Sequence, residues 1–171
     1  SISVTYKQVL NNNNAVNFQY STNGKNKWTD ISSYITDTST VVKQADGSTD
    51  NTIDGSAVSA DYTANSFAVD YVGAFSIGDL ILTTGECMII KHISGSTLTV
   101  ERGIFGTGPA SLSSTNQIFK VEWKTKKLSL PSIESCQSIQ FRYKPSTSSY
   151  TEINDITVEF RPIRGKIVSD G

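Results

Sequence analysis

The chain has 171 residues, of which 37% are hydrophobic and 18% are charged, and its formal net charge at pH 7 is -1. This length can hold one ordinary domain or two small ones, with a core that needs no metal or disulfide. The near-zero charge excludes a global attraction to nucleic acid or acidic lipid, and no apolar run approaches the roughly 18 residues of a membrane-spanning helix, so we expect neither kind of partner.

Uncharged polar residues replace the missing charge and favour an all-β fold. The sequence contains 24 Ser, 19 Thr and 11 Asn. Thr, Val, Ile, Phe and Tyr favour pleated strands, whereas Ser, Asn and Gly favour turns. Because no long stretch repeats at the helical period of 3.6 residues, the composition predicts antiparallel sheets rather than a helical bundle.

The first predicted element is a hairpin whose pattern returns near the end of the chain. Residues 16–31 read VNFQYSTNGKNKWTDI, and residues 139–153 read IQFRYKPSTSSYTEI. Each segment places a β-branched residue, Phe and Tyr at alternate positions, which share one face of a strand. A polar turn and an aromatic-Thr-acid-Ile group follow. The repeat predicts two pseudo-symmetric hairpins of one sandwich, and the alternative is convergence of two amphipathic hairpins.

Residues 46–66 are predicted to form a mobile connection. They contain four Asp, no basic residue and few apolar ones, so they offer little to a core. Their spacing faintly resembles a calcium-binding loop, in which Asp46, Ser48, Asp50 and Asp54 would be ligands. Asn51 and Ala57 stand where that loop needs Gly and an acid, so an ordinary solvated loop is favoured and no metal is expected.

Between residues 67 and 122 the sequence predicts a compact β module. Gly-Asp, Thr-Gly and Ser-Gly-Ser groups mark its turns, and the strands are expected at about 67–71, 80–83, 86–93, 97–102 and 117–122. Short, closely spaced strands are typical of a small barrel or rolled sheet. We therefore expect residues 60–122 to form a small β-barrel-like module inserted into an antiparallel β-sandwich made of residues 1–59 and 123–171.

The glycine-rich stretch at 103–108 does not predict a phosphate site. No helix pattern and no Lys-Ser/Thr pair follows it, and a P-loop requires both. Glycines in this stretch instead permit an irregular crossing of the chain. The preceding Arg102 is best interpreted as an ion-pair or carbonyl anchor for that crossing.

Few residues are available for catalysis. The only histidine, His92, alternates with Met88 and Ile90, as an ordinary strand position does. Cys87 and Cys136 form no CxxC motif and cannot complete a typical zinc site with one histidine. Reduced thiols are favoured, and a disulfide between the two cysteines is the alternative. Acid pairs such as Glu152 and Asp155 exist, but nothing marks them as catalytic. We expect a non-enzymatic protein with no catalytic, metal or cofactor-binding residues.

Basic residues concentrate toward the C-terminus. Trp123 is followed by Lys124, Lys126 and Lys127, and lysines on a short edge strand commonly prevent strand-to-strand aggregation. A protected edge or a protein contact is favoured over nucleic acid, because only one aromatic residue accompanies the lysines. Residues 160–166 alternate basic and apolar side chains, which suits a final edge strand or an arm that docks on a neighbour.

Residues 75–110 resemble a module that is common in structural proteins of tailed bacteriophages. The resemblance rests on the order and spacing of four segments, FSIGDLI (75–81), ECMII (86–90), ISGSTLTVERG (93–103) and IFGTGPA (104–110). One departure is visible, since many members have a histidine shortly after the last segment and this chain has Leu112 and Ser113. The module occurs in tail fibres, baseplates and necks, so the resemblance implies a part of a virion without specifying its position.

The resemblance and the missing catalytic residues together predict a structural component of a tailed-phage virion, in the tail, baseplate or fibre-attachment region. The expected partners are other virion proteins and copies of the chain itself, assembled in the host cytoplasm. One alternative is a carbohydrate- or receptor-binding module that contacts a host-surface glycan; a further alternative is a neck or capsid decoration protein. For the glycan-binding module the candidate aromatic residues are Trp28, Tyr34, Tyr62 and Tyr150.

Overall fold

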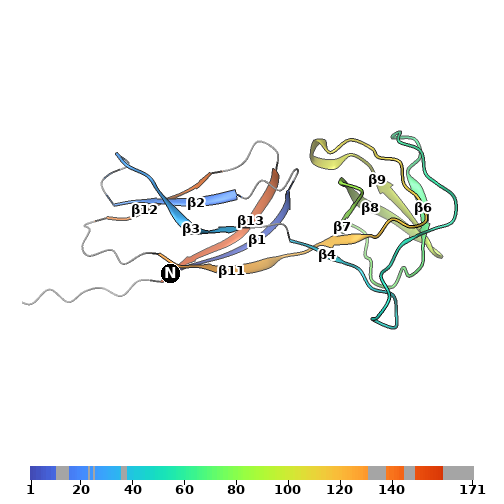
Figure 1. Ribbon diagram of the computed structural model, residues 1–171, viewed down its shortest axis with the longest axis horizontal. Helices are drawn as coiled ribbons and strands as arrows, with labels where there is room; N and C mark the ends of the chain where they lie inside the picture. The colour runs from blue at the N-terminus through green and yellow to red at the C-terminus, as the bar shows by residue number, and fades with distance from the viewer. Residues whose placement is uncertain are drawn as a thin grey trace, which may run out of the picture.

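The computed structural model describes residues 1–10, 16–22, 24, 26–35, 38–130, 138–144 and 149–159. Antiparallel strands form two units, which lie side by side along the long axis of the molecule (Figure 1). One short 3-10 turn, Ile104–Gly106, is the sole helical element of the described residues. None of the described helical structure meets the length and apolarity that crossing a membrane requires. The prediction of an all-β, antiparallel fold is confirmed.

The first unit is a sandwich of two three-stranded sheets, with the strand orders β11-β1-β13 and β12-β2-β3. Side chains that alternate along the strands meet between the sheets, as the pleat requires. Its strands are β1 (Ile2–Leu10), β2 (Val16–Ser21), β3 (Thr29–Ile35), β11 (Lys124–Leu128), β12 (Gln140–Lys144) and β13 (Ser149–Val158). Its buried core consists of Ile2, Val4, Tyr6, Phe18, Ile31 and Leu128.

The two repeated strand segments pair directly with one another in this sandwich. In the antiparallel ladder of β2 and β12, Phe18 lies opposite Tyr143 and Tyr20 lies opposite Phe141. The Phe18 and Tyr143 rings also meet in the core, 5.7 Å apart between centroids. The repeat therefore creates a local two-fold relation whose centre is the pair of Gln19 and Arg142.

The predicted second hairpin is wrong. Strand β12 pairs with β2, whereas β13 pairs along the whole of β1 in the opposite sheet. Alternating apolar residues specify which face of a strand is buried, but they do not specify which neighbour completes its ladder. The nine residues of β1 give the ten-residue β13 a longer partner than the five-residue β12 would.

The second unit is a single curved sheet with the strand order β4-β10-β7-β8-β9-β6-β5. The five strands predicted between residues 67 and 122 are all present. The strands are β4 (Ser39–Val41), β5 (Ile53–Asp54), β6 (Ser66–Val69), β7 (Leu80–Thr83), β8 (Glu86–Ser94), β9 (Thr97–Glu101) and β10 (Phe119–Val121). The named strands do not close into a barrel, although Ile53 N donates to Asn116 O at 3.1 Å and so brings β5 toward the segment before β10.

Residues 46–66 contribute to the core of the second unit, so the prediction of a mobile connection is corrected. Ile53 is fully buried and Val58 is nearly so, and both belong to the same cluster as Met88 and Leu98. Strand β5 from this segment pairs with β6. These apolar residues are few and irregularly spaced, and the polar composition around them concealed their burial.

The predicted domain boundary at residue 60 is also misplaced. Strands β4 and β5 lie before it, yet both are hydrogen-bonded into the seven-stranded sheet. The chain enters this unit after Thr38 and leaves it at Glu122, whose amide donates to the Thr38 carbonyl at 3.4 Å. The entry and exit points are thus adjacent, and residues 39–121 form the inserted unit.

The two units meet through a small apolar junction. Val9 of β1 and Tyr150 of β13 pack against Leu80, Cys87 and Val121 of the second unit. Tyr150 also stacks on Phe105, with ring centroids 3.4 Å apart. At the exit from the second unit, Lys7 Nζ lies 4.8 Å from the Trp123 ring centroid.

Replacing residues 39–121 with a short Gly/Ser linker should leave a cooperatively folding sandwich. The sandwich core contains no residue of the inserted unit, and the two cut ends are already within hydrogen-bond reach of each other. Exposure of Val9 at the former junction should cost about 1.5–3 kcal/mol. Circular dichroism during urea denaturation would measure this, and a broad, non-cooperative transition would show that the sandwich depends on the insert.

Candidate functional site

A buried ion pair between Glu86 and Arg102 organises one end of the seven-stranded unit. Glu86 is the first residue of β8, and Arg102 follows β9, so the hairpin between these strands brings them together. Arg102 Nε lies 2.9 Å from Glu86 Oε1 and Nη2 lies 2.6 Å from Oε2. Both side chains are completely buried. The pair has the bidentate geometry that gives the strongest charge-assisted hydrogen bonds.

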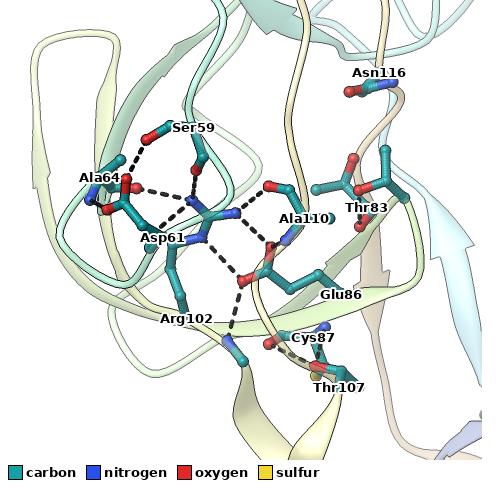
Figure 2. A network of polar contacts seen from close by, with 12 residues as sticks. Ser59, Asp61, Ala64, Thr83, Glu86, Cys87, Arg102, Thr107, Ala110 and Asn116 are labelled. Carbon is teal, nitrogen blue, oxygen red and sulfur yellow. Dashed lines mark hydrogen bonds and ion pairs between the residues drawn. The ribbon is translucent and has the colours of Figure 1, made fainter.

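The remaining donors and acceptors of the pair bind two loops (Figure 2). Arg102 Nη1 donates to the carbonyls of Ser59 at 2.7 Å, Asp61 at 3.2 Å and Ala64 at 3.0 Å. The Arg102 Nη2 atom donates to the Ala110 carbonyl. Glu86 accepts hydrogen bonds from the amides of Gly103 at 3.0 Å and Ala110 at 2.8 Å.

These contacts confirm the interpretation of Arg102 as an ion-pair and carbonyl anchor. The irregular crossing predicted for the glycine-rich stretch at 103–108 is present, and Phe105 within it has a positive φ of 58°. Sequence reasoning missed the partner, Glu86. A signal was available, because Glu86 alternates with Met88 and Ile90 and both of these are fully buried. A carboxylate on a buried strand face requires a cationic or hydrogen-bonding partner.

The loop at residues 59–64 is further held by the carboxylate of Asp61. It accepts hydrogen bonds from the amides of Thr63 at 2.8 Å and Ala64 at 2.9 Å. The hydroxyls of Ser59 and Thr63 also donate to it. These bonds stabilise the carboxylate, so the pKa of Asp61 lies well below its usual range, with the Ser59 hydroxyl as the largest cause.

Tyr62 projects from this loop with 63% of its surface exposed. Its ring lies against Gly103, where an added Cβ would approach within 2.7 Å of Tyr62 Cε1. Gly103 also has a positive φ of 66°, so glycine is required here both for backbone conformation and for space. A shallow groove beside the ring is lined by Tyr62, Asn65, Lys91, Thr99, Val100, Glu101 and Arg102.

The described residues that the sequence analysis considered for catalysis, and did not favour, lie in different parts of the structure. His92 is exposed on β8, opposite Thr99. Cys87 is buried at the junction, and Cys136 lies outside the described residues. Glu152 accepts a hydrogen bond from the Tyr150 hydroxyl at 3.1 Å, whereas Asp155 accepts one from the Thr157 hydroxyl at 2.9 Å.

Asp46 and Asp50 of the calcium-like pattern bind protein groups rather than facing one common site. The Asp46 carboxylate accepts hydrogen bonds from the amides of Ser48 at 3.0 Å and Thr49 at 3.2 Å. Asp50 instead binds Lys43 and Gln117. Across the part of the chain that the structure describes, no group of three or more His, Cys, Asp or Glu side chains is placed to hold a metal ion.

The aromatic residues proposed for sugar binding have different surroundings. Trp28 lies beneath the Arg142 guanidinium, 4.3 Å from ring centroid to Cζ, and Tyr150 is stacked on Phe105. The side chain of Tyr34 lies outside what the structure describes. Tyr62 is the candidate that combines high exposure with a neighbouring groove.

No family model, no curated protein and no solved structure matches this chain. The resemblance of residues 75–110 to a phage module therefore stays a prediction.

Removing either partner of the buried ion pair should destabilise the second unit severely. Arg102→Met or Glu86→Met should each cost about 3–5 kcal/mol, because the other charge is left buried and unpaired. The double variant should lose less than the sum of the two. Urea denaturation would measure these free energies, with Glu101→Gln as the control because its ion pair with Lys91 is exposed and worth about 0–1 kcal/mol. Additive losses would contradict direct coupling.

The depressed pKa of Asp61 predicts a loss of loop order in acid. The contribution of this carboxylate is fully present above its unfolded pKa of about 3.9 and is lost as the pH falls through the lower folded value. NMR titration of the Thr63 and Ala64 amides should therefore show a midpoint well below 4, and Asp61→Asn should abolish that titration. A midpoint near the ordinary value would contradict the observed hydrogen bonding.

Proposed function

We propose that the chain is a non-enzymatic structural component of a tailed-phage virion, in the tail, baseplate or fibre-attachment region. It acts by assembling with other virion proteins and with copies of itself. The sequence pattern of residues 75–110 supports the virion setting. The single observation that supports assembly is an edge strand, β13, with exposed apolar residues on its core-facing side.

Ile156 and Val158 are 45% and 36% exposed. In the ladder with β1, Ile156 lies opposite Val4 and Val158 lies opposite Ile2. Paired residues of neighbouring strands point to the same face, and both Val4 and Ile2 are completely buried. The apolar face of the sheet thus continues to an edge where the opposing sheet no longer covers it.

The opposite edges of this sheet differ in how they would receive another strand. Strand β11 forms one edge and carries Lys124, Lys126 and Lys127, a composition that disfavours pairing with a further strand. Strand β13 forms the other edge and has no lysine. Strand addition at β13 would complete its backbone hydrogen bonds and cover Ile156 and Val158. We therefore place the assembly contact at β13.

Assembly at this edge is compatible with the proposed tail, baseplate or fibre-attachment position and also with the alternative of a neck or capsid decoration protein. Virions of the phage whose genome encodes the chain would be purified and analysed by mass spectrometry. The chain should be detected at a fixed copy number relative to the other structural proteins. Its absence from purified virions, with the free protein abundant in the lysate, would refute the virion function.

Ile156→Asp should prevent incorporation of the chain into particles without unfolding it. The aspartate would place a charge on the face that the added strand must cover, whereas the present side chain is already nearly half exposed. The matched control is Thr157→Asp, which adds the same charge to the opposite face of the same strand. Each tagged variant would be expressed during particle formation, and the amount of tagged protein in purified particles would be measured. We expect that amount to fall by at least about tenfold for Ile156→Asp only. Equal incorporation of both variants would contradict assembly through β13.

A further inference from the structure

A groove beside Tyr62, at the end of the seven-stranded unit, has features that assembly through β13 does not use. Of its seven lining residues, Val100 and Arg102 are buried, and the other five present accessible or polar atoms. We propose that this groove binds a neutral pyranose unit of a glycan. All of the residues that line the groove lie between 62 and 102, and none of them belongs to β13. The proposal therefore does not depend on the virion function.

Several hydrogen bonds hold the loop that presents the Tyr62 ring. The carboxylate of Asp61 binds the amides directly after Tyr62. Arg102 binds the carbonyls of Ser59 and Asp61, which precede Tyr62 in the chain, and of Ala64, which follows it. Close contact with Gly103 restricts the ring itself. An exposed aromatic side chain that is already ordered loses little further entropy when a ligand stacks on it.

The wall of the groove supplies both hydrogen-bond donors and acceptors. Lys91 Nζ and Glu101 Oε2 form an ion pair of 2.7 Å, and each side chain is more than half exposed. Asn65 adds an amide, and the Thr99 hydroxyl lies 3.0 Å from that of Ser66. A pyranose has hydroxyls that both donate and accept, together with an apolar C–H face that suits an aromatic ring.

Charge and apolar area distinguish a sugar from other ligands. Because Lys91 and Glu101 neutralise each other, the groove offers no excess positive charge to a phosphate or to nucleic acid. Val100 is the one aliphatic lining residue and is only 2% exposed. A protein hot spot would normally have a wider apolar surround. A single aromatic platform beside polar groups therefore favours a neutral saccharide.

The test uses the purified 171-residue chain, titrated with glucose, galactose, mannose, N-acetylglucosamine and their short oligomers and followed by the NMR shifts of its backbone amides. We expect a dissociation constant near 1 mM, which corresponds to about -4 kcal/mol. Titration with sugar to roughly 50 mM therefore covers the concentrations at which the site would fill. At least one sugar should bind saturably and shift the Asn65 and Thr99 amides. Tyr62→Ala should reduce that affinity at least tenfold, and Tyr62→Phe should preserve it within about threefold because the platform remains.

The control variant is Trp123→Ala, which removes another exposed aromatic side chain that does not line the groove and should leave sugar binding unchanged. The shifts of the wild-type amides keep the test valid even if Tyr62→Ala folds poorly. Absence of saturable shifts with every sugar would overturn the proposal. A Tyr62→Ala variant that binds sugar normally but fails to enter particles would also overturn it and assign the groove to a protein contact. Failure of sugar binding alone would leave assembly through β13 intact.

Discussion

The loops of the seven-stranded unit depend on the buried pair of Glu86 and Arg102. Neither charge is tolerable alone in the interior, because desolvation costs more than an isolated charge recovers. The pair is compensated by hydrogen bonds to loop backbone atoms on two sides of the hairpin. Those hydrogen bonds in turn give the loop carbonyls and the Ala110 amide partners, as partly buried polar groups require. The buried charges are therefore compensated only when the two loops adopt this conformation, and this conformation also positions Tyr62.

The same network reaches the sandwich through the crossing that follows Gly103. This crossing carries Phe105 to its stack on Tyr150 of β13. On the other side of the junction, the Thr38 side chain accepts from the Gln8 amide at 2.9 Å and donates to the Gln8 carbonyl at 3.1 Å. The chain is thus pinned to β1 just before it enters the second unit. Two separate cores are held in one arrangement by a few contacts near their connections.

The sequence predicts those elements of the fold that are determined by residues close together in the chain. Turn residues and alternation located β7, β8 and β9, and Arg102 was recognised as an anchor from its place before a glycine-rich crossing. Predictions failed where a distant partner decides. Strand β13 pairs with β1 rather than with β12. Ile53 is buried in the core of the second unit, although the residues around it in the sequence are mostly polar. The groove at Tyr62 was beyond prediction because Asn65, Lys91 and Glu101 converge only once β6, β8 and β9 are adjacent.

The ends of β1 and β13 give the sandwich a directional mechanical weakness. The Ser1 amino group donates to the Glu159 carbonyl at 2.9 Å, and the Ser1 hydroxyl donates to the Glu159 carboxylate at 2.7 Å. A force that pulls these neighbouring strand ends apart acts along the inter-strand hydrogen bonds, because those bonds run perpendicular to antiparallel strands. The ladder then opens one bond at a time, like a zipper, at low load. A force along the strands instead loads all of the bonds together, so the sandwich resists shear far better than peeling.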